Sequence, residues 1–210
     1  MGTSRVFLLS PARTDGRRAK LLFNERAAFS LAVQLRSPEG VEIGEVYSFL
    51  SGLYFRGKLT YARAFAPRRE AAPTILVITP ERGLVPPETR VTLDDLRQFS
   101  LVDIATGDDR YVAPLRRDAR NLSSTLPNDA ELVLLGSIAT GKYVDALIAE
   151  FGTRLVFPSE FVGRGDMSRG GLLLRRAREG QELAYMPVEG ATRRGKRPPR
   201  LEPLRRTRKA

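Results

Sequence analysis

Four short apolar runs recur along this chain of 210 residues, and their arrangement limits the possible folds more than any other feature. They read SRVFLLS, TILVITP, ELVLL and RLVFP, at residues 4–10, 74–80, 131–135 and 154–158. Segments with helical spacing of apolar residues lie between and after them, at 17–36, 45–65, 92–103, 110–126, 141–151 and 168–180. Short buried strands separated by helices are typical of an α/β fold with a mainly parallel sheet flanked by helices. We therefore expect a single α/β domain over residues 1–190.

Local signals predict several helix ends. Thr92 and Asp95 have the spacing of a capping box, and Ser168 is placed to cap the last helix. Gly180 is expected to end that helix, because glycine readily adopts the left-handed conformation found after many helices. The helix in 110–126 is expected to begin after Pro114.

Most of the positive charge lies at the carboxyl end of the chain. The formal net charge is +11, of which residues 193–210 supply +8 through nine Lys or Arg and one Glu. A segment so rich in Pro and Arg buries too little apolar surface to offset its ordering entropy, which predicts a disordered basic tail over residues 191–210. Such a tail suits a polyanionic partner, with nucleic acid as our leading expectation and a merely solubilising end as the alternative.

The chain has neither cysteine nor histidine. Disulfides, thiolate nucleophiles, Cys/His zinc sites and histidine general bases are therefore excluded. We expect no metal site and no cofactor, and any catalysis would use carboxylates, lysine, tyrosine, serine or backbone amides. No apolar run is long enough to cross a bilayer and no signal peptide is evident, so we expect a cytoplasmic protein without a membrane partner. The sequence does not indicate an oligomeric state.

Polar residues follow the first and third apolar runs. Ligands of parallel sheets bind at the carboxyl ends of strands, which directs attention to Ser10 and Arg13 after the first run. After the third run, GSIATGKY has the Gly-x4-Gly-Lys spacing of a phosphate-binding loop, but Tyr143 stands where a magnesium-binding Ser or Thr belongs. Ser137 and Lys142 could contact a phosphate there, and an ordinary strand–helix turn is the alternative.

The loop GRGDMSRGG follows the fourth apolar run. Gly163 and Gly165 allow close backbone approach, and Arg164 and Arg169 carry guanidiniums suited to phosphate. Asp166 could pair with one of these arginines or act as a carboxylate beside a bound anion. An anion-binding loop and a structural arginine-rich turn are both open.

Four segments, in the same order, resemble the YaaA family of bacterial proteins linked to peroxide stress. FLLSPAR resembles that family's strand ending in Ser-Pro-Ala-Lys, with Arg13 at the lysine position, and FLSGLY resembles its Leu-Ser-Gly-Leu-Tyr segment. LLGSIATGKY resembles Asn-Leu-Ala-Ser-x-x-Tyr, and RGDMSR resembles Arg-Gly-x-Met-x-Arg. The resemblance implies a compact α/β domain with a basic, DNA-binding cleft and a role in protection against oxidative damage. The basic tail has no counterpart in the family.

We therefore expect a nucleic-acid-binding α/β protein of the YaaA-like type, with a possible part in stress response. Tyr54, Tyr143 and Phe161 could stack on bases, with core packing as the alternative. A second reading is a hydrolase of a nucleotide or nucleic acid, such as one cleaving an N-glycosidic bond, with Asp166 as catalytic carboxylate and Asp145 and Glu160 as further candidates. A third is an interaction protein that docks through its tail. The expected nucleic-acid or phosphate contacts are Ser10, Arg13, Ser51, Tyr54, Ser137, Lys142, Tyr143, Arg164, Gly165 and Arg169.

Overall fold

A computed structural model describes residues 4–67, 72–104, 107–199 and 201, and it confirms the α/β fold. A six-stranded sheet with the order β4-β3-β1-β6-β7-β8 forms its centre. The inner strands are parallel and correspond to the four predicted runs: β1 (Arg5–Leu9), β3 (Ile75–Ile78), β6 (Glu131–Leu135) and β7 (Leu155–Pro158). The edge strands β4 (Leu84–Val85) and β8 (Tyr185–Pro187) are antiparallel, and β2 (Val41–Glu42) pairs separately with β5 (Arg90–Val91).

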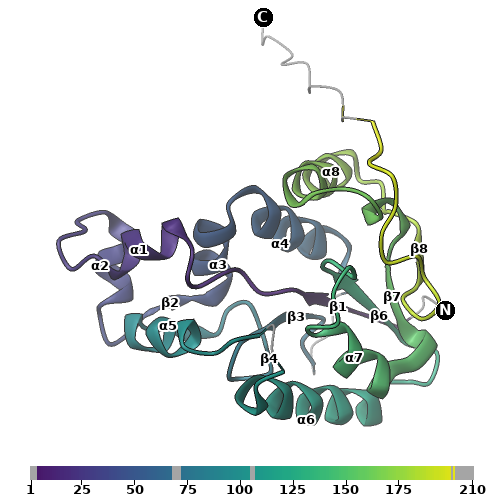
Figure 1. Cartoon of the computed structure of the whole chain (residues 1–210), viewed down its shortest axis with the longest axis horizontal. Helices are drawn as coiled ribbons and strands as arrows, with labels where there is room; N and C mark the ends of the chain where they lie inside the picture. Colours follow the sequence, from purple (N-terminus) through teal and green to yellow (C-terminus); the bar gives the residue numbers. More distant parts are fainter. Residues whose placement is uncertain (1–3, 68–71, 105–106, 200, 202–210) are drawn as a thin grey trace, which may run out of the picture.

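Helices cover both faces of the sheet. Figure 1 shows α4 (Leu53–Phe65) and α8 (Asp166–Glu179) on one face, and α6 (Asp109–Thr125) and α7 (Val144–Phe151) on the other. The remaining helices gather beyond the carboxyl end of β1: α1 (Arg17–Phe23), α2 (Ser30–Leu35), α3 (Ile43–Ser51) and α5 (Leu93–Ser100). Two 3-10 turns, η1 (Gly152–Arg154) and η2 (Ser159–Phe161), flank β7. No helix in the described ranges is long and apolar enough to cross a membrane.

The order of the strands creates a switch point between β1 and β6. The chain leaving β1 passes through α4 and returns as β3 on one side, whereas the chain leaving β6 passes through α7 and returns as β7 on the other. The two connections run over opposite faces of the sheet (Figure 1). The loops therefore diverge at the carboxyl ends of β1 and β6, where α/β sheets form their ligand crevices.

Two predicted helices are each divided in two. The segment 17–36 forms α1 and α2, separated at residues 24–29, and the segment 45–65 forms α3 and α4, separated at Gly52. Gly52 has φ +60°, and the guanidinium of Arg18 lies against its Cα where a side chain would otherwise project. The positive φ favours glycine, because other residues adopt it only with strain, so the chain turns there.

The expected helix ends are partly right. The capping box of Thr92 and Asp95 is confirmed, as is the left-handed Gly180 after α8. The cap of α8 was wrong: the helix begins at Asp166, with Gly165 as its N-cap and no side-chain cap, so Ser168 lies inside the first turn. Helix α6 also begins earlier than predicted, at Asp109, with Pro114 inside it.

Part of the predicted tail lies within the described residues. Arg193 forms an ion pair of 3.1 Å with Asp145, and the backbone at Lys196 lies against Gly163. Leu201 packs against the core. Residue 200 and residues 202–210 lie outside the described residues.

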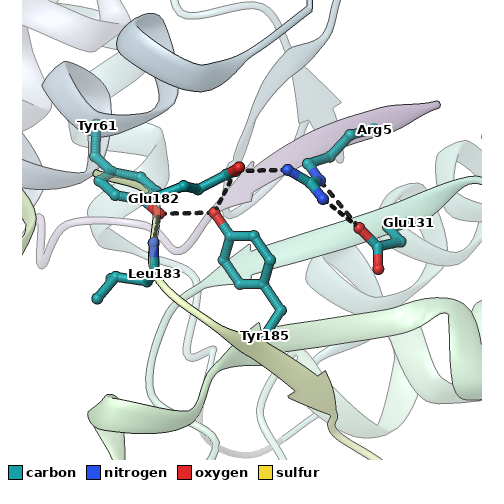
Figure 2. Close-up of polar contacts among 6 residues, drawn as sticks. All are labelled: Arg5, Tyr61, Glu131, Glu182, Leu183 and Tyr185. Atoms are coloured by element: carbon teal, nitrogen blue, oxygen red, sulfur yellow. Dashed lines mark hydrogen bonds and ion pairs between the residues drawn. The ribbon is translucent and has the colours of Figure 1, made fainter. Parts of the chain in front are cut away.

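A chain of polar contacts ties the last strand to the amino-terminal end of the sheet (Figure 2). Arg5 of β1 forms ion pairs with Glu131 at 2.7 Å and Glu182 at 2.5 Å. Tyr185 of β8 donates a hydrogen bond of 2.8 Å to the same Glu182 carboxylate, and its hydroxyl lies 2.8 Å from that of Tyr61 on α4. These contacts join β1, β6, β8 and α4 at the end of the sheet opposite the switch point.

Helices α4 and α8 touch through glycines. A Cβ atom built on Gly57 would lie 2.7 Å from the carbonyl oxygen of Gly170, and one built on Gly170 would lie 2.6 Å from the carbonyl oxygen of Leu53. These obstacles are backbone atoms, which cannot move aside as a side chain can. The two backbones therefore pack directly on each other, and this packing sets the separation of the side chains on the two helices.

We predict that Gly170→Ala lowers the free energy of unfolding by about 1–3 kcal/mol, because the added methyl group overpacks the contact. Gly171→Ala is the matched control: its Cβ would meet only the side chain of Leu201, at 3.6 Å, and alanine favours the helix by about 0.5–1 kcal/mol. Urea denaturation of both variants measures the difference. Equal stabilities would show that the backbones do not pack as closely as described.

Candidate active site at the switch point

A cavity of about 320 Å³ opens at the switch point between β1 and β6. Most of the residues predicted from the sequence line it, so the loops after β1 and β6 lie together there. The predicted residues in its wall are Ser10, Arg13, Ser51, Tyr54, Ser137, Lys142, Tyr143 and Asp166. They come from the loops after β1 and β6, the end of α3 and the first turns of α4 and α8.

Two further cavities adjoin this one, and all three share Arg13. The larger, of about 560 Å³, extends over the start of α1 and adds Arg17, Arg18 and Lys20 to its lining. The side chain of Arg13 is 81% exposed and pairs with the exposed Asp15. The mouth of the crevice is therefore mainly positive and accessible to solvent.

Lys58 lies beneath the crevice on α4. Its side chain is buried, and Nζ donates hydrogen bonds of 2.5 Å to the Ser10 carbonyl oxygen and 2.9 Å to Ser10 Oγ. The amine also lies 4.5 Å from the ring centre of Tyr54 and 4.8 Å from that of Phe55. Burial lowers the pKa of Lys58 to about 7, although the nearby Asp166 carboxylate acts in the opposite direction.

Ser10 is the point at which the buried lysine meets the crevice. Ser10 lines the cavity whereas Lys58 does not, and both Ser10 Oγ and the Tyr143 hydroxyl lie over Gly136. The Tyr143 hydroxyl donates a hydrogen bond of 2.8 Å to the Ser137 carbonyl oxygen. Burial raises the pKa of Tyr143 to about 12, so this hydroxyl stays protonated at neutral pH. A side chain at position 136 would displace both hydroxyls.

The hydroxyl of Tyr54 is buried and has no hydrogen-bond partner among the described residues. Burial raises the pKa of this phenol, which therefore remains neutral. Its ring supports Lys58 and packs edge-on against Phe161 at 6.5 Å between centroids. Phe161 is a core residue that does not line the cavity, so its position favours core packing over stacking on a base.

The arginines of the GRGDMSRGG loop face inward. Arg169 is buried and donates hydrogen bonds of 3.1 and 3.2 Å to the Phe161 carbonyl oxygen. Arg164 donates to the Glu160 carbonyl oxygen and to Ser168 Oγ. Neither guanidinium, nor Gly165, lines the crevice. Of the predicted residues in this loop the structure brings only Asp166 to the crevice, and its side chain is 68% exposed and 3.4 Å from Arg169.

The loop after β6 does not have the interior of a triphosphate site. The carboxylate of Asp145, in the first turn of α7, lies against Gly141, so a negative charge already occupies this loop. The same carboxylate pairs with Arg193. Asp145 therefore serves a local ion pair and does not line the crevice, and the same holds for Glu160, which pairs with Arg176.

Lys58 was missed in reading the sequence. A signal was present, because the lysine lies on a helix between apolar neighbours, four residues after Tyr54, on what proves to be the buried face of α4. Lysine is rarely fully buried without a partner, so its position on an apolar face marks it as unusual. Its partner is more than 40 residues away, and only the fold shows that partner to be Ser10.

The fold and the crevice define an α/β protein with a site at the switch point of its sheet, and basic residues line the edge of that site. Comparison with protein-family models, with curated proteins and with solved structures finds no match to this chain. The resemblance to the YaaA family therefore remains an interpretation of the four sequence segments.

The lowered pKa of Lys58 predicts a pH dependence of stability. Between about pH 7 and the ordinary lysine pKa of 10.5, the unfolded chain binds a proton at this residue that the folded chain does not. The free energy of unfolding should thus rise with pH in wild type relative to Lys58→Met, by about 1 kcal/mol per pH unit from pH 7.5 to 9.5.

Chemical denaturation across this pH range measures the difference. Lys20→Met serves as the control, because Lys20 is exposed on α1 and its removal should leave the slope of wild type unchanged. Parallel pH profiles for wild type and Lys58→Met would contradict a neutral, buried amine.

Proposed function

We propose that this protein binds nucleic acid at the crevice, through phosphates held at its positive edge. The observation that carries the proposal is the convergence of three cavities on Arg13, with Arg17, Arg18, Lys20 and Lys142 along their walls. Exposed guanidinium and ammonium groups supply most of the affinity of proteins for the phosphate backbone.

The shape of the site also favours a polymer over a compact anion. The three cavities adjoin one another from the start of α1 to the loop beside α5, so the basic residues line a path and not a single pocket. The described part of the basic tail adds Arg193, beside the loop that carries Lys142. A chain of phosphates could contact several of these groups at once, and each contact releases counterions.

We predict that Arg13→Ala combined with Lys142→Ala reduces the salt dependence of binding. Loss of two phosphate contacts on duplex DNA should make the slope of log K against log salt less negative by about 1.8, with weaker binding at low salt. Fluorescence anisotropy of labelled single- and double-stranded DNA across a salt series measures this.

The matched control is Arg116→Ala combined with Arg178→Ala, which removes the same charge from exposed positions on α6 and α8. A variant of the tail measures its contribution to DNA affinity separately. It carries glutamine in place of Arg200, Arg205, Arg206, Arg208 and Lys209. If the crevice pair and the control pair weaken binding equally, the crevice is not the binding surface. If only the tail variant loses binding, the body of the protein has another role.

We infer a second function from Asp166, namely hydrolysis of a bond in the nucleotide or nucleic acid that binds. This carboxylate is exposed in the same crevice as Ser10 and Tyr143, and it lies where it could orient water or stabilise a cationic sugar. Release of free base from oligonucleotides and nucleotides, followed by chromatography, tests cleavage of an N-glycosidic bond.

Asp166→Asn should lower such a rate about 100-fold or more, since an amide cannot act as the base. Asp109→Asn is the control, because Asp109 is exposed at the start of α6 and does not line the crevice. Equal rates in the two variants would exclude Asp166 as the catalytic carboxylate.

A further inference from the structure

We infer that Ser10 is a nucleophile toward the phosphorus of phosphate esters, with Lys58 as the acceptor of its proton. The inference rests on the proposed binding of a phosphate-bearing ligand in the crevice, and it names a covalent step and a pair of residues for that site. The structural evidence for it is the geometry of a serine that faces the crevice and an amine held behind that serine.

The geometry is that of a nucleophile joined to its base. Ser10 Oγ lines the crevice, and Lys58 Nζ lies 2.9 Å from it on the side away from the cavity. The second bond of Nζ, 2.5 Å long, is donated to the carbonyl oxygen of Ser10 and fixes the amine relative to the hydroxyl. A nucleophile and base within hydrogen-bonding reach, with the base held by a third group, is the arrangement that activates serine hydroxyls.

Burial puts the amine in the required protonation state. The pKa of Lys58 is lowered to about 7, chiefly by burial, so the neutral amine is populated at neutral pH. In its neutral form the amine can donate to the Ser10 carbonyl oxygen and accept from the Ser10 hydroxyl through its lone pair, which reverses the bond that the ammonium form donates to Oγ. A lysine that served only to hold the loop would gain nothing from this state, because the ammonium form donates to both oxygens.

The positive groups of the crevice suit an electrophile at phosphorus. Arg13 and Lys142 line the same cavity as Ser10 and would neutralise the oxygens of a phosphate ester as the fifth bond forms.

The step balances without a further reactant. Ser10 Oγ attacks phosphorus, the Oγ–P bond forms and the bond from phosphorus to the departing ester oxygen breaks, while the hydroxyl proton passes to Lys58. The departing oxygen leaves toward the open crevice and takes a proton from solvent, while the proton from Ser10 stays on Lys58. Water then attacks the phosphorus of the resulting seryl phosphodiester or phosphomonoester and releases a proton to solvent, while the Oγ–P bond breaks and Lys58 returns its proton to Ser10 Oγ.

An alkyl fluorophosphonate tests the pair on the intact chain. In this reaction the Oγ–P bond forms, the P–F bond breaks, fluoride leaves and the proton moves to Lys58. Intact-mass spectrometry follows the gain of one phosphonyl group, and peptide mapping identifies the labelled residue. The labelling rate is measured from pH 5 to 9.

The expected result is one label, at Ser10, with a rate that rises about tenfold per pH unit below pH 7 and levels off above it. Ser10→Ala should abolish labelling and Lys58→Met should reduce its rate at least 100-fold, whereas Ser124→Ala should match wild type. Ser124 is an exposed serine on α6 that does not line the crevice.

Three results would overturn the inference: no label at Ser10, an equal rate in Lys58→Met, or a rate without an inflection near pH 7. The pH profile of wild type does not depend on the folding of any variant. The reagent needs no nucleic acid, so failure of labelling with DNA binding intact overturns only the inference. Loss of the crevice-dependent DNA binding with labelling intact overturns only the proposed function.

Discussion

The direct contact of α4 with α8 through Gly57 and Gly170 is the constraint on which the site depends. Helix α4 carries Tyr54 and Lys58, and α8 carries Asp166 and Arg169. Because backbone touches backbone, these side chains lie in one small region instead of across an ordinary helix interface, where side chains separate the axes by 8–10 Å. The lysine can then be buried between aromatic rings and still reach the loop after β1.

The topology of the sheet supplies the other half of the site. Connections that leave β1 and β6 over opposite faces open a crevice between their loops, and Ser10 and Ser137 lie at its base. The close packing of α4 on α8 provides one wall and the start of α1 provides the basic edge. The two ends of the sheet therefore have different tasks: the network of Arg5, Tyr61 and Tyr185 holds the amino end together, while the carboxyl end stays open (Figure 2).

The guanidiniums of this protein divide into two groups that look alike in the sequence. Arg164 and Arg169 donate to the backbone carbonyl oxygens of Glu160 and Phe161, so their charge organises the loop before α8. Arg13 has a single exposed carboxylate partner and remains accessible. A buried guanidinium that satisfies carbonyls is costly to redirect to a ligand, because those carbonyls would lose their hydrogen bonds. The number of arginines in a glycine-rich loop therefore does not tell whether they are buried on carbonyl oxygens or accessible to a ligand.

The sequence alone determined the four parallel strands, the α/β class, the capping box at Thr92 and eight of the residues that line the cavity at the switch point. These features follow from local composition and from the rule that ligands meet the carboxyl ends of strands. Tertiary structure alone decided that Gly52 divides a helix, that Arg169 faces inward and that Lys58 meets Ser10. Gly52 meets Arg18 and Lys58 meets Ser10 across segments far apart in the chain, whereas Arg169 reaches a carbonyl oxygen in its own loop region. The burial that lowers the pKa of the lysine exists only once the distant segments have packed together.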